Sequence, residues 1–264
     1  MSRAITSLAN PTVKAARALH MRKAREESGQ FLAEGLKIVT EAVELGHAPR
    51  RLLYSAEAAA HPLARRARAA TEAAGGEAIE VSHEILAKIS RRDNPQTVLA
   101  VFDQAFSTLA ALDPAAAPCW VALEAVRDPG NLGTIVRTAD AAGCGGVILV
   151  GDCCDPYSVE AVRATMGSVF AVRIAKASVA EFLVWRAAWP GSVVGTLLSA
   201  QADFRVATYA PPSLILMGNE QAGLTPELAA ACDLTVKIPM RGRADSLNLA
   251  VATGVMIYAA TGGA

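Results

Sequence analysis

A polar turn in the last third of the sequence could hold a nucleotide-like ligand. Gly218, Asn219 and Glu220 come directly after the short apolar run 214–217, which is typical of a buried strand. In parallel α/β sheets, ligands bind outside the carboxyl ends of the strands. Glycine lets the backbone come close to a ligand, so Gly218 and Gly223 suit such a turn. The pattern therefore predicts a ligand-binding edge.

A second polar loop follows the next predicted strand. The apolar run 234–238 ends at a proline, and the loop 240–245 then leads into an apolar helix that we expect to begin near Ser246. Helix N-termini offer free N–H groups to a ligand. Ser246 and Asn248 are unusual openers for so apolar a helix, but Ser246 is equally explained as a plain N-cap.

A third stretch, 127–150, reads as a turn, a helix and a strand. Its glycines at 130 and 133 do not form a dinucleotide fingerprint, and no Walker A loop is present. Asn131 lies in the first turn of the predicted helix. Arg137 stands among small and apolar residues, so its guanidinium group needs an anion or a solvent-exposed face, and the exposed face is the commoner answer.

Basic residues concentrate near the start of the chain. The segment 11–25 reads as one helix with a proline at its start, and its charged face either is solvated or tracks RNA phosphates. The turn 91–95 adds two arginines, for which ordinary turn chemistry is the alternative. The candidate RNA-binding residues are Lys14, Arg17, Arg22, Lys23, Arg25, Arg91 and Arg92.

Composition describes a well-buried globular protein of 264 residues, with 52% hydrophobic and 19% charged residues. No apolar run is long enough to cross a membrane. Five cysteines without metal-site spacing indicate reduced thiols, no metal and a cytoplasmic location. The net charge is zero, but residues 1–104 carry 15 Lys and Arg against 12 Asp and Glu, which weakly favours a nucleic-acid partner for that half.

Strand-like and helix-like segments alternate in both halves of the chain, which indicates α/β folds. We expect a smaller N-terminal domain over 1–104, a linker rich in Ala and Pro over 105–118, and a second domain with a parallel sheet over 119–264. The run 192–198 is a predicted strand whose end, at Thr196 and Leu197, is another possible rim for a ligand.

Three motifs in order now resemble one family. They are N-L-G-T-I-V-R-T-A at 131–139, M-G-N-E-x-x-G-L at 217–224, and I-P-M at 238–240 followed by S-L-N-L-A-V-A at 246–252. The chain resembles the SpoU/TrmH family of the SPOUT class, RNA ribose 2′-O-methyltransferases that use S-adenosylmethionine. The pieces F-L-A-E-G at 31–35 and N-P-Q-T-V-L-A-V at 94–101 are similar to the family's accessory RNA-binding domain, which is like ribosomal protein L30e.

The resemblance implies a parallel SPOUT sheet with a deep trefoil knot and a homodimer whose active site draws on both subunits. It assigns the cofactor mainly to backbone groups near Thr196, Leu197, Gly218, Ile238, Met240 and Leu247. The implied catalytic residues are Arg137, Asn131, Glu220, Ser246 and Asn248. Because guanidinium is a poor base near neutral pH, we expect Arg137 to grip a phosphate and orient the hydroxyl, with Glu220 as its partner.

The accessory domain favours 23S ribosomal RNA as substrate over transfer RNA. A non-catalytic RNA-binding protein of the same fold is the main alternative, although the five implied catalytic residues are all present. A nucleotide-binding domain that acts on a small molecule is a third hypothesis, but it leaves the basic segment 11–25 unexplained. Methylation of ribosomal RNA for antibiotic self-resistance would have the same architecture.

Overall fold

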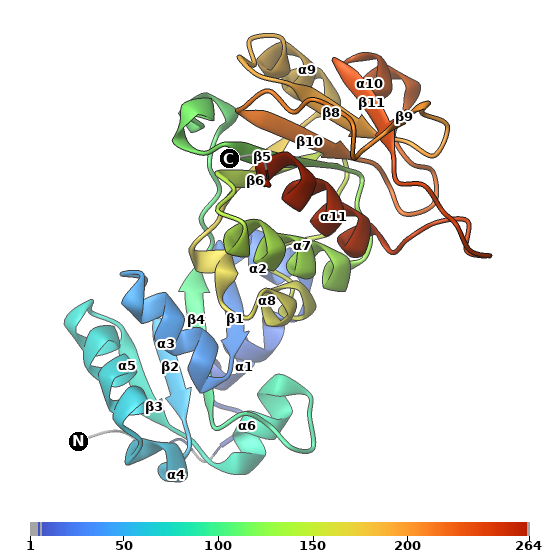
Figure 1. Cartoon of the computed structure of the whole chain (residues 1–264). Helices are drawn as coiled ribbons and strands as arrows, with labels where there is room; N and C mark the ends of the chain where they lie inside the picture. Colours follow the sequence, from blue (N-terminus) through green and yellow to red (C-terminus); the bar gives the residue numbers. More distant parts are fainter. Residues whose placement is uncertain (1–4, 6, 263–264) are drawn as a thin grey trace. The chain divides into compact units, whose positions relative to one another are not determined.

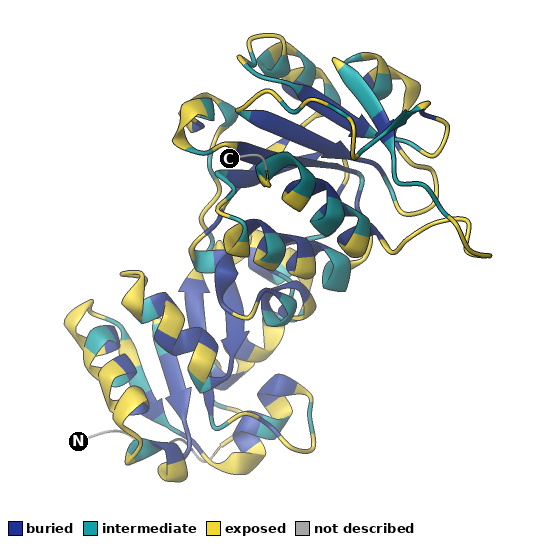
Figure 2. Cartoon of the chain, in the orientation of Figure 1, coloured by how far each residue is buried: buried dark blue, intermediate teal, exposed yellow. Residues whose placement is uncertain are grey.

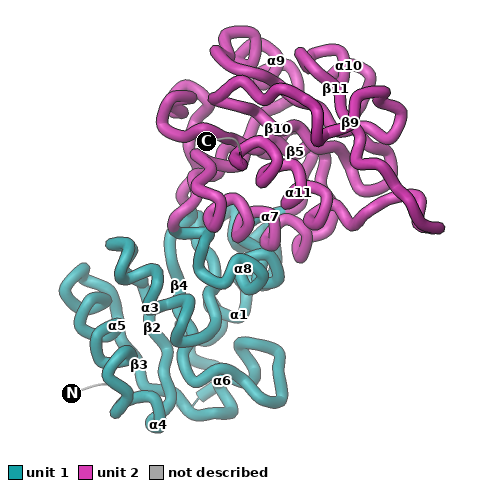
Figure 3. The backbone as a smooth tube through the Cα atoms, viewed as in Figure 1, with its two compact units in different colours: residues 1–104, 155–170 teal, residues 105–154, 171–264 magenta. Residues whose placement is uncertain are grey.

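The computed structural model describes residues 5 and 7–262, so the outermost residues of both predicted domains lie outside the described part. The chain forms two compact units, coloured separately in Figure 3. Unit 1 comprises residues up to 104 together with 155–170, and unit 2 comprises 105–154 and 171–264. No helix among the described residues is long and apolar enough to cross a membrane.

Unit 1 is built on a mixed four-stranded sheet in the order β1-β4-β2-β3 (Figure 1). β4 is antiparallel to both β1 and β2, and β2 is parallel to β3. The strands are β1 (Gln30–Glu34), β2 (Arg51–Tyr54), β3 (Glu77–Glu80) and β4 (Val98–Asp103). The helices are α1 (Pro11–Ala18), α2 (Arg22–Ser28), α3 (Leu36–Glu44), α4 (Ala56–Ala59), α5 (Pro62–Ala73), α6 (His83–Ser90) and α8 (Val159–Thr165), with the 3₁₀ turn η3 (Ser168–Phe170).

Local sequence signals place most of these elements. Pro62 opens α5 at its first position, where the missing N–H costs nothing, and Ser82 caps α6 by accepting from the Ile85 N–H. The single helix predicted over 11–25 is wrong, because the chain breaks between α1 and α2. Arg25 fixes this break: its side chain is buried and its Nη1 donates to the Leu19 carbonyl at 2.7 Å.

The segment 155–170 packs in unit 1, although its sequence neighbours on both sides belong to unit 2. Two ion pairs fasten it. Asp155 accepts from Arg25 at 2.7 Å with both side chains buried, and Arg163 donates to the buried Glu34 carboxylate at 2.6 Å. The ring of Phe31 also lies 4.7 Å from that of Tyr157, centroid to centroid. This segment therefore completes the core of unit 1.

Unit 2 contains a seven-stranded, entirely parallel sheet in the order β7-β6-β5-β10-β8-β11-β9. The α/β class and the parallel sheet predicted from the sequence are confirmed. The strands are β5 (Cys119–Glu124), β6 (Gly146–Val150), β7 (Arg173–Ala177), β8 (Val193–Thr196), β9 (Ala202–Asp203), β10 (Ser213–Met217) and β11 (Leu234–Lys237). The helices are α7 (Pro129–Ala141), α9 (Val179–Arg186), α10 (Pro226–Ala230) and α11 (Leu249–Thr261).

Helices cover both faces of this sheet, so its central strands are buried along their length (Figure 2). α7 and α11 pack against each other on one face (Figure 1). On the other face, Trp120 and Leu214 share a core cluster with Phe182 of α9 and Leu228 of α10. Side chains alternate along a strand, so the two faces use different residues of the same strands.

The predicted linker takes part in this second core. It forms two 3₁₀ turns, η1 (Leu109–Ala111) and η2 (Pro114–Ala116), and Leu112 between them is buried in the cluster around Trp120. The Trp120 indole N–H donates to the Pro114 carbonyl at 3.2 Å. The segment 105–118 is thus packed rather than free. The trefoil knot implied by the resemblance stays a prediction.

Candidate active site

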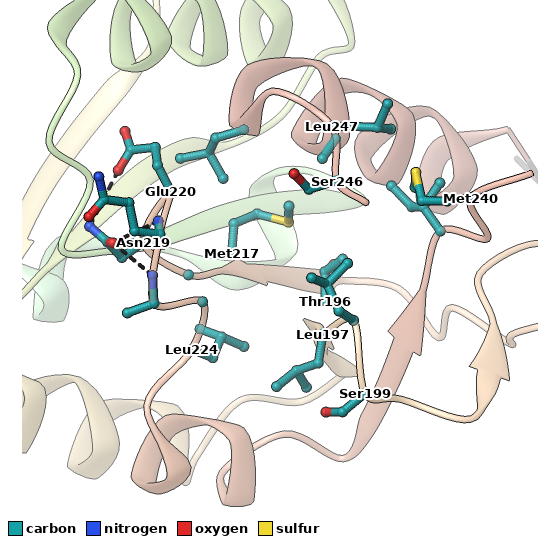
Figure 4. Close-up of a pocket in the computed structure, with 18 residues that line it drawn as sticks. Thr196, Leu197, Ser199, Met217, Asn219, Glu220, Leu224, Met240, Ser246 and Leu247 are labelled. Carbon is teal, nitrogen blue, oxygen red and sulfur yellow. Dashed lines mark hydrogen bonds between the residues drawn. The ribbon is translucent and has the colours of Figure 1, made fainter. Parts of the chain in front are cut away.

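A pocket of about 410 Å³ opens at the carboxyl ends of β8, β10 and β11 in unit 2 (Figure 4). All six residues predicted to bind the cofactor line it, and so do Glu220 and Ser246 of the predicted catalytic set. The remaining lining residues come from the same three loops and the start of α11. They are Leu198, Ser199, Met217, Asn219, Gln221, Ala222, Gly223, Leu224, Leu249 and Ala252.

The turn after β10 is held rigidly by its own hydrogen bonds. Asn219 and Gly223 exchange backbone hydrogen bonds at 3.0 and 2.9 Å, and the Asn219 side chain accepts from the Gln221 and Ala222 N–H groups. A Cβ on Gly218 would lie 2.0 Å from the Gly223 carbonyl carbon. Gly218 is therefore required by the fold of the turn itself, and not only by the approach of a ligand.

Glu220 ties this turn to the start of α7. Its carboxylate accepts from the backbone N–H groups of Arg127 and Asp128 at 3.1–3.2 Å, and from the Asn131 side-chain amide at 3.4 Å. Burial alone would raise the pKa of the Glu220 carboxyl, but these hydrogen bonds outweigh it and leave the pKa below its ordinary value. The carboxylate thus fixes the backbone that leads into α7, whose N-cap is Asp128.

Asn248 extends the network to α11. Its Nδ2 donates to Asn131 Oδ1 at 2.8 Å, and its own Oδ1 accepts from the Ala250 and Val251 N–H groups. Asn248 is therefore the N-cap of α11, which begins at Leu249, and the predicted start near Ser246 is wrong. Ser246 lies before the helix, exposed at the pocket, where its hydroxyl donates to Asp245.

The three motifs meet in this network. Asn131 of the first motif bonds both to Glu220 of the second, 89 residues away in sequence, and to Asn248 of the third, 117 residues away. A single asparagine can do so because its amide both donates and accepts. The sequence predicts Glu220 in the turn after a strand and both asparagines at the starts of helices, and the structure brings the three together.

Arg137 lies elsewhere in unit 2. It is exposed on α7, less than two helical turns beyond Asn131, and it does not line the pocket. At a rise of ~1.5 Å per residue, six residues place it ~9 Å further along the helix. Within one chain Arg137 does not pair with Glu220, because that carboxylate accepts from the backbone just before α7 and Arg137 forms no ion pair with a described residue.

The pocket wall suits an amphipathic ligand such as a nucleoside with a charged tail. Leucines 197, 224 and 247, with Ile238 and Met240, supply an apolar lining, while Asn219, Ser199 and Ser246 supply polar groups. The hydroxyl of Thr196 is buried in the wall without a hydrogen-bond partner in the protein. A buried hydroxyl left in this way is unfavourable unless a ligand or water bonds to it. The lining therefore fits S-adenosylmethionine.

Two features of the site had no clear signal in the sequence. Glu124 at the end of β5 is buried, and its carboxylate accepts from the Thr225 N–H at 2.8 Å, which fixes the loop between β10 and α10. Ala125, next along the chain, has a left-handed φ of 48°, and its carbonyl accepts from the Asn219 side chain. An acidic residue ending an apolar strand is the only pattern that could have indicated Glu124.

The basic residues proposed for RNA contact divide into three groups. Lys14, Arg17 and Arg91 are exposed, and Arg92 is half-buried. Arg22 and Lys23 are exposed but pair with glutamates one turn further along α2. Arg25 is buried on Asp155 and Leu19, so its prediction as a surface RNA-binding residue is wrong. Its burial depends on a segment 130 residues away in sequence.

Among the described residues, no group of three or more His, Cys, Asp or Glu side chains is placed to hold a metal ion. The five cysteines are all free thiols.

Comparison with known proteins agrees with this arrangement. Residues 118–258 match the SpoU rRNA methylase family, and residues 10–100 match the MRM3-like substrate binding domain. The chain belongs to the SpoU rRNA methylase family. It is 34% identical, over 90% of its length and 85% of the relative's, to the 23S rRNA (uridine(2479)-2′-O)-methyltransferase of Streptomyces viridochromogenes.

A second relative is the 23S rRNA (guanosine(2553)-2′-O)-methyltransferase RlmP of Bacillus subtilis, 30% identical over 96% of this chain and 97% of the relative. Among solved structures, the AdoMet-bound rRNA methyltransferase of Sinorhizobium meliloti superposes with a TM-score of 0.91 at 49% identity. That match covers 98% of this chain and 97% of the other. Family and fold are thereby established over nearly the whole chain.

Proposed function

We propose that this protein transfers a methyl group from S-adenosylmethionine to a ribose 2′-hydroxyl of 23S ribosomal RNA. The observation that carries the proposal is the network in which Asn131 joins Glu220 and Asn248 beside a pocket lined by all six predicted cofactor residues. The relatives named above that carry a substrate in their names act on 23S ribosomal RNA. The N-terminal match to a substrate-binding domain supports the same class of substrate.

The residues of the pocket suit this reaction because it needs positioning more than charge stabilisation. S-adenosylmethionine supplies an electrophilic methyl group, and transfer forms an O–C bond as an S–C bond breaks, with loss of the hydroxyl proton. The sulfonium cation becomes a neutral thioether as the methyl group leaves, so no charge has to be stabilised on the leaving group, and holding the hydroxyl in line with the S–C bond contributes most. The hydrogen-bonded turns around Gly218 and Asn248 provide such fixed walls.

Arg137 has the role of orienting the RNA. A guanidinium group stays protonated at neutral pH, so it cannot act as an efficient base. It can bind a phosphate next to the acceptor ribose through two parallel hydrogen bonds. Its exposure on α7, without a partner among the described residues, leaves the group available for this contact. The phosphate could then accept the hydroxyl proton.

The protein works as a homodimer in this proposal, because one chain does not bring Arg137 to its own pocket. No residue of α7 lines the pocket, whereas Glu220 and Ser246 do. The neighbouring helix α11 is apolar, yet Val251 and Tyr258 on it are more than half exposed. An apolar exposed helix face favours a subunit interface. A second copy seated there would supply Arg137 in trans.

Mixing two inactive variants tests the shared site. Arg137→Ala keeps its pocket, and Met240→Trp, verified not to bind the cofactor, keeps its arginine. Random pairing makes half of the dimers mixed, with one complete site each, so about a quarter of wild-type activity should return. No recovery from the mixture would contradict assembly of the site across two chains, while leaving methyl transfer itself intact.

The substrate is tested with tritium-labelled S-adenosylmethionine and two RNA pools, ribosomal and transfer, from a strain that lacks the protein. Label in 23S RNA, retained at one alkali-resistant dinucleotide, is the expected result. Label in transfer RNA alone would reassign the substrate. Cofactor binding without label in either pool would favour a non-catalytic RNA-binding role. We also infer that the protein acts in the cytoplasm, where its five free cysteines would stay reduced.

A further inference from the structure

A short exposed segment stands at the mouth of the pocket. We name residues 241–245 the rim loop, because Met240 before it and Ser246 after it both line the pocket. Every residue of the rim loop is exposed, and a Cβ on Gly242 would meet no atom within 4 Å. Figure 1 shows this part of the chain, between β11 and α11, projecting away from the sheet of unit 2. The rim loop therefore serves no packing role in the folded chain.

The rim loop carries two arginines in a unit that is otherwise acidic. Unit 2 contains nine Lys and Arg against eleven Asp and Glu. Three of its arginines, at 127, 186 and 205, form ion pairs with aspartates. Among the described residues of unit 2, the arginines without an ion pair are Arg137, Arg173, Arg241 and Arg243. Two of these four lie in the rim loop.

The nearby carboxylates are already engaged. Asp203 on β9 accepts from both the backbone and the guanidinium group of Arg205. Asp245 accepts from the Ser246 hydroxyl. Arg241 acts on Asp203 only through its charge, and neither Arg241 nor Arg243 forms an ion pair with a described residue, so both guanidinium groups remain available to an external anion at the pocket mouth. Because unit 2 has a net negative charge, attraction of an RNA backbone to this unit has to come from such local groups.

We propose that Arg241 and Arg243 bind RNA phosphates that flank the acceptor ribose and so position the 2′-hydroxyl over the pocket. This inference rests on the proposed function and names a contact for it. A ribose enters a pocket at the end of a sheet with its phosphodiesters outside, at the rim. Arginine suits this contact because its planar fork matches phosphate geometry and its charge does not titrate. Both residues are positioning residues rather than catalytic ones.

The test is the double variant Arg241→Ala/Arg243→Ala, assayed on the RNA that the wild type methylates. Each phosphate contact to single-stranded RNA is worth about 5-fold in affinity near 0.1 M salt, so KM for RNA should rise about 25-fold. The slope of log affinity against log salt should fall by about 1.4. At saturating RNA, kcat should stay near wild type, and cofactor affinity should not change.

Two control variants test whether the effect depends on where the arginines lie and whether it requires more than their charge. Arg173→Ala removes another exposed arginine, at the amino end of β7 on the opposite edge of the sheet, and should leave KM and the salt slope unchanged. Arg241→Lys/Arg243→Lys keeps the charge without the fork, and should retain most of the salt slope while KM rises only a few-fold.

An unchanged KM and salt slope in the alanine variant, with an active wild type, would overturn the role of the rim loop and leave the proposed function standing. Loss of cofactor binding, or of the dimer by sedimentation, would also overturn it, since the loop would then support the pocket or the subunit interface. Failure of the wild type to label any RNA would refute the proposed function instead.

Discussion

The loops around the pocket and the helices at the start of unit 1 both present polar side chains, but they use them differently. Around the pocket, Asn131, Asn219, Glu220 and Asn248 each bond to backbone groups or to one another. On α1 and α2 most basic side chains are exposed or paired within their own helix. Polar residues in the turns after strands and at the starts of the neighbouring helices therefore indicate a functional site, whereas a charged helix face is explained equally well by function and by solvation.

Removing the one exposed arginine of the α7 motif should have the largest effect. Arg137→Ala should lower kcat/KM by about 10²–10³-fold, the usual loss when a positioned donor is removed from a reacting centre. Melting temperature and cofactor affinity should be nearly unchanged, because Arg137 is exposed and lies outside the pocket. Labelled methyl transfer and a thermal melt measure both. Wild-type turnover in this variant would remove Arg137 from the reaction.

Two arginines of the N-terminal segment should differ strongly in their contribution to stability. Arg25→Ala leaves Asp155 charged and buried without its ion-pair partner, so the free energy of unfolding should fall by about 3–5 kcal/mol. Arg17→Ala on the exposed face of α1 should change stability by less than about 0.5 kcal/mol. Urea unfolding followed by circular dichroism distinguishes them. If the two variants have the same free energy of unfolding, the buried ion pair of Arg25 with Asp155 does not stabilise the fold.

Glu220 should make the stability of the protein depend on pH. Its folded pKa is lower than the unfolded one, so its contribution to stability is complete above the ordinary pKa of about 4.3 and is lost as pH falls through the folded pKa. The contribution is small, because the side chain is exposed. In Glu220→Gln, the melting temperature should depend less on pH at acidic pH. Methyl transfer should also be slower, because the turn at Arg127 and Asp128 loses the carboxylate that holds it. A thermal-melt series from pH 3 to 6 that is identical for both proteins would exclude this role.

The smallest effect concerns the cap of α11. Asn248→Ala should cost about 1 kcal/mol through the lost cap. Asn248→Asp keeps an acceptor for the Ala250 and Val251 N–H groups but removes the donor to Asn131. The aspartate variant should therefore melt near wild type and still lose activity. If both variants keep full activity, the bond between the first and third motifs is structural only.

Much of the fold could be predicted because its signals are local. The span of α5, the caps of α6 and α10, and the strand–helix alternation all follow from prolines, serines, threonines and apolar runs within a few residues. The pocket could be predicted because its residues end strands and carry family motifs. In both cases the deciding interaction lies close in sequence or in a recognisable pattern.

The features that could not be predicted from the sequence depend on contacts between distant segments. The burial of Arg25 requires Asp155, and the engagement of Glu220 by the start of α7 requires two loops more than ninety residues apart. The packing of 155–170 with unit 1 also follows from partners outside its own sequence, Glu34 and Phe31. Periodicity describes which face of a helix is apolar, but it does not say which segment will cover that face.

The path of segment 155–170 also constrains how such a protein can be altered by recombination. The backbone passes between the two units at three places, near residues 104, 154 and 170. A gene fusion that replaces residues 1–104 with those of a relative would keep the original α8, Asp155 and Arg163. The two ion pairs of these residues would then have to form with a new partner sequence. An exchange of the N-terminal unit between relatives would therefore have to replace the segment 155–170 together with residues 1–104.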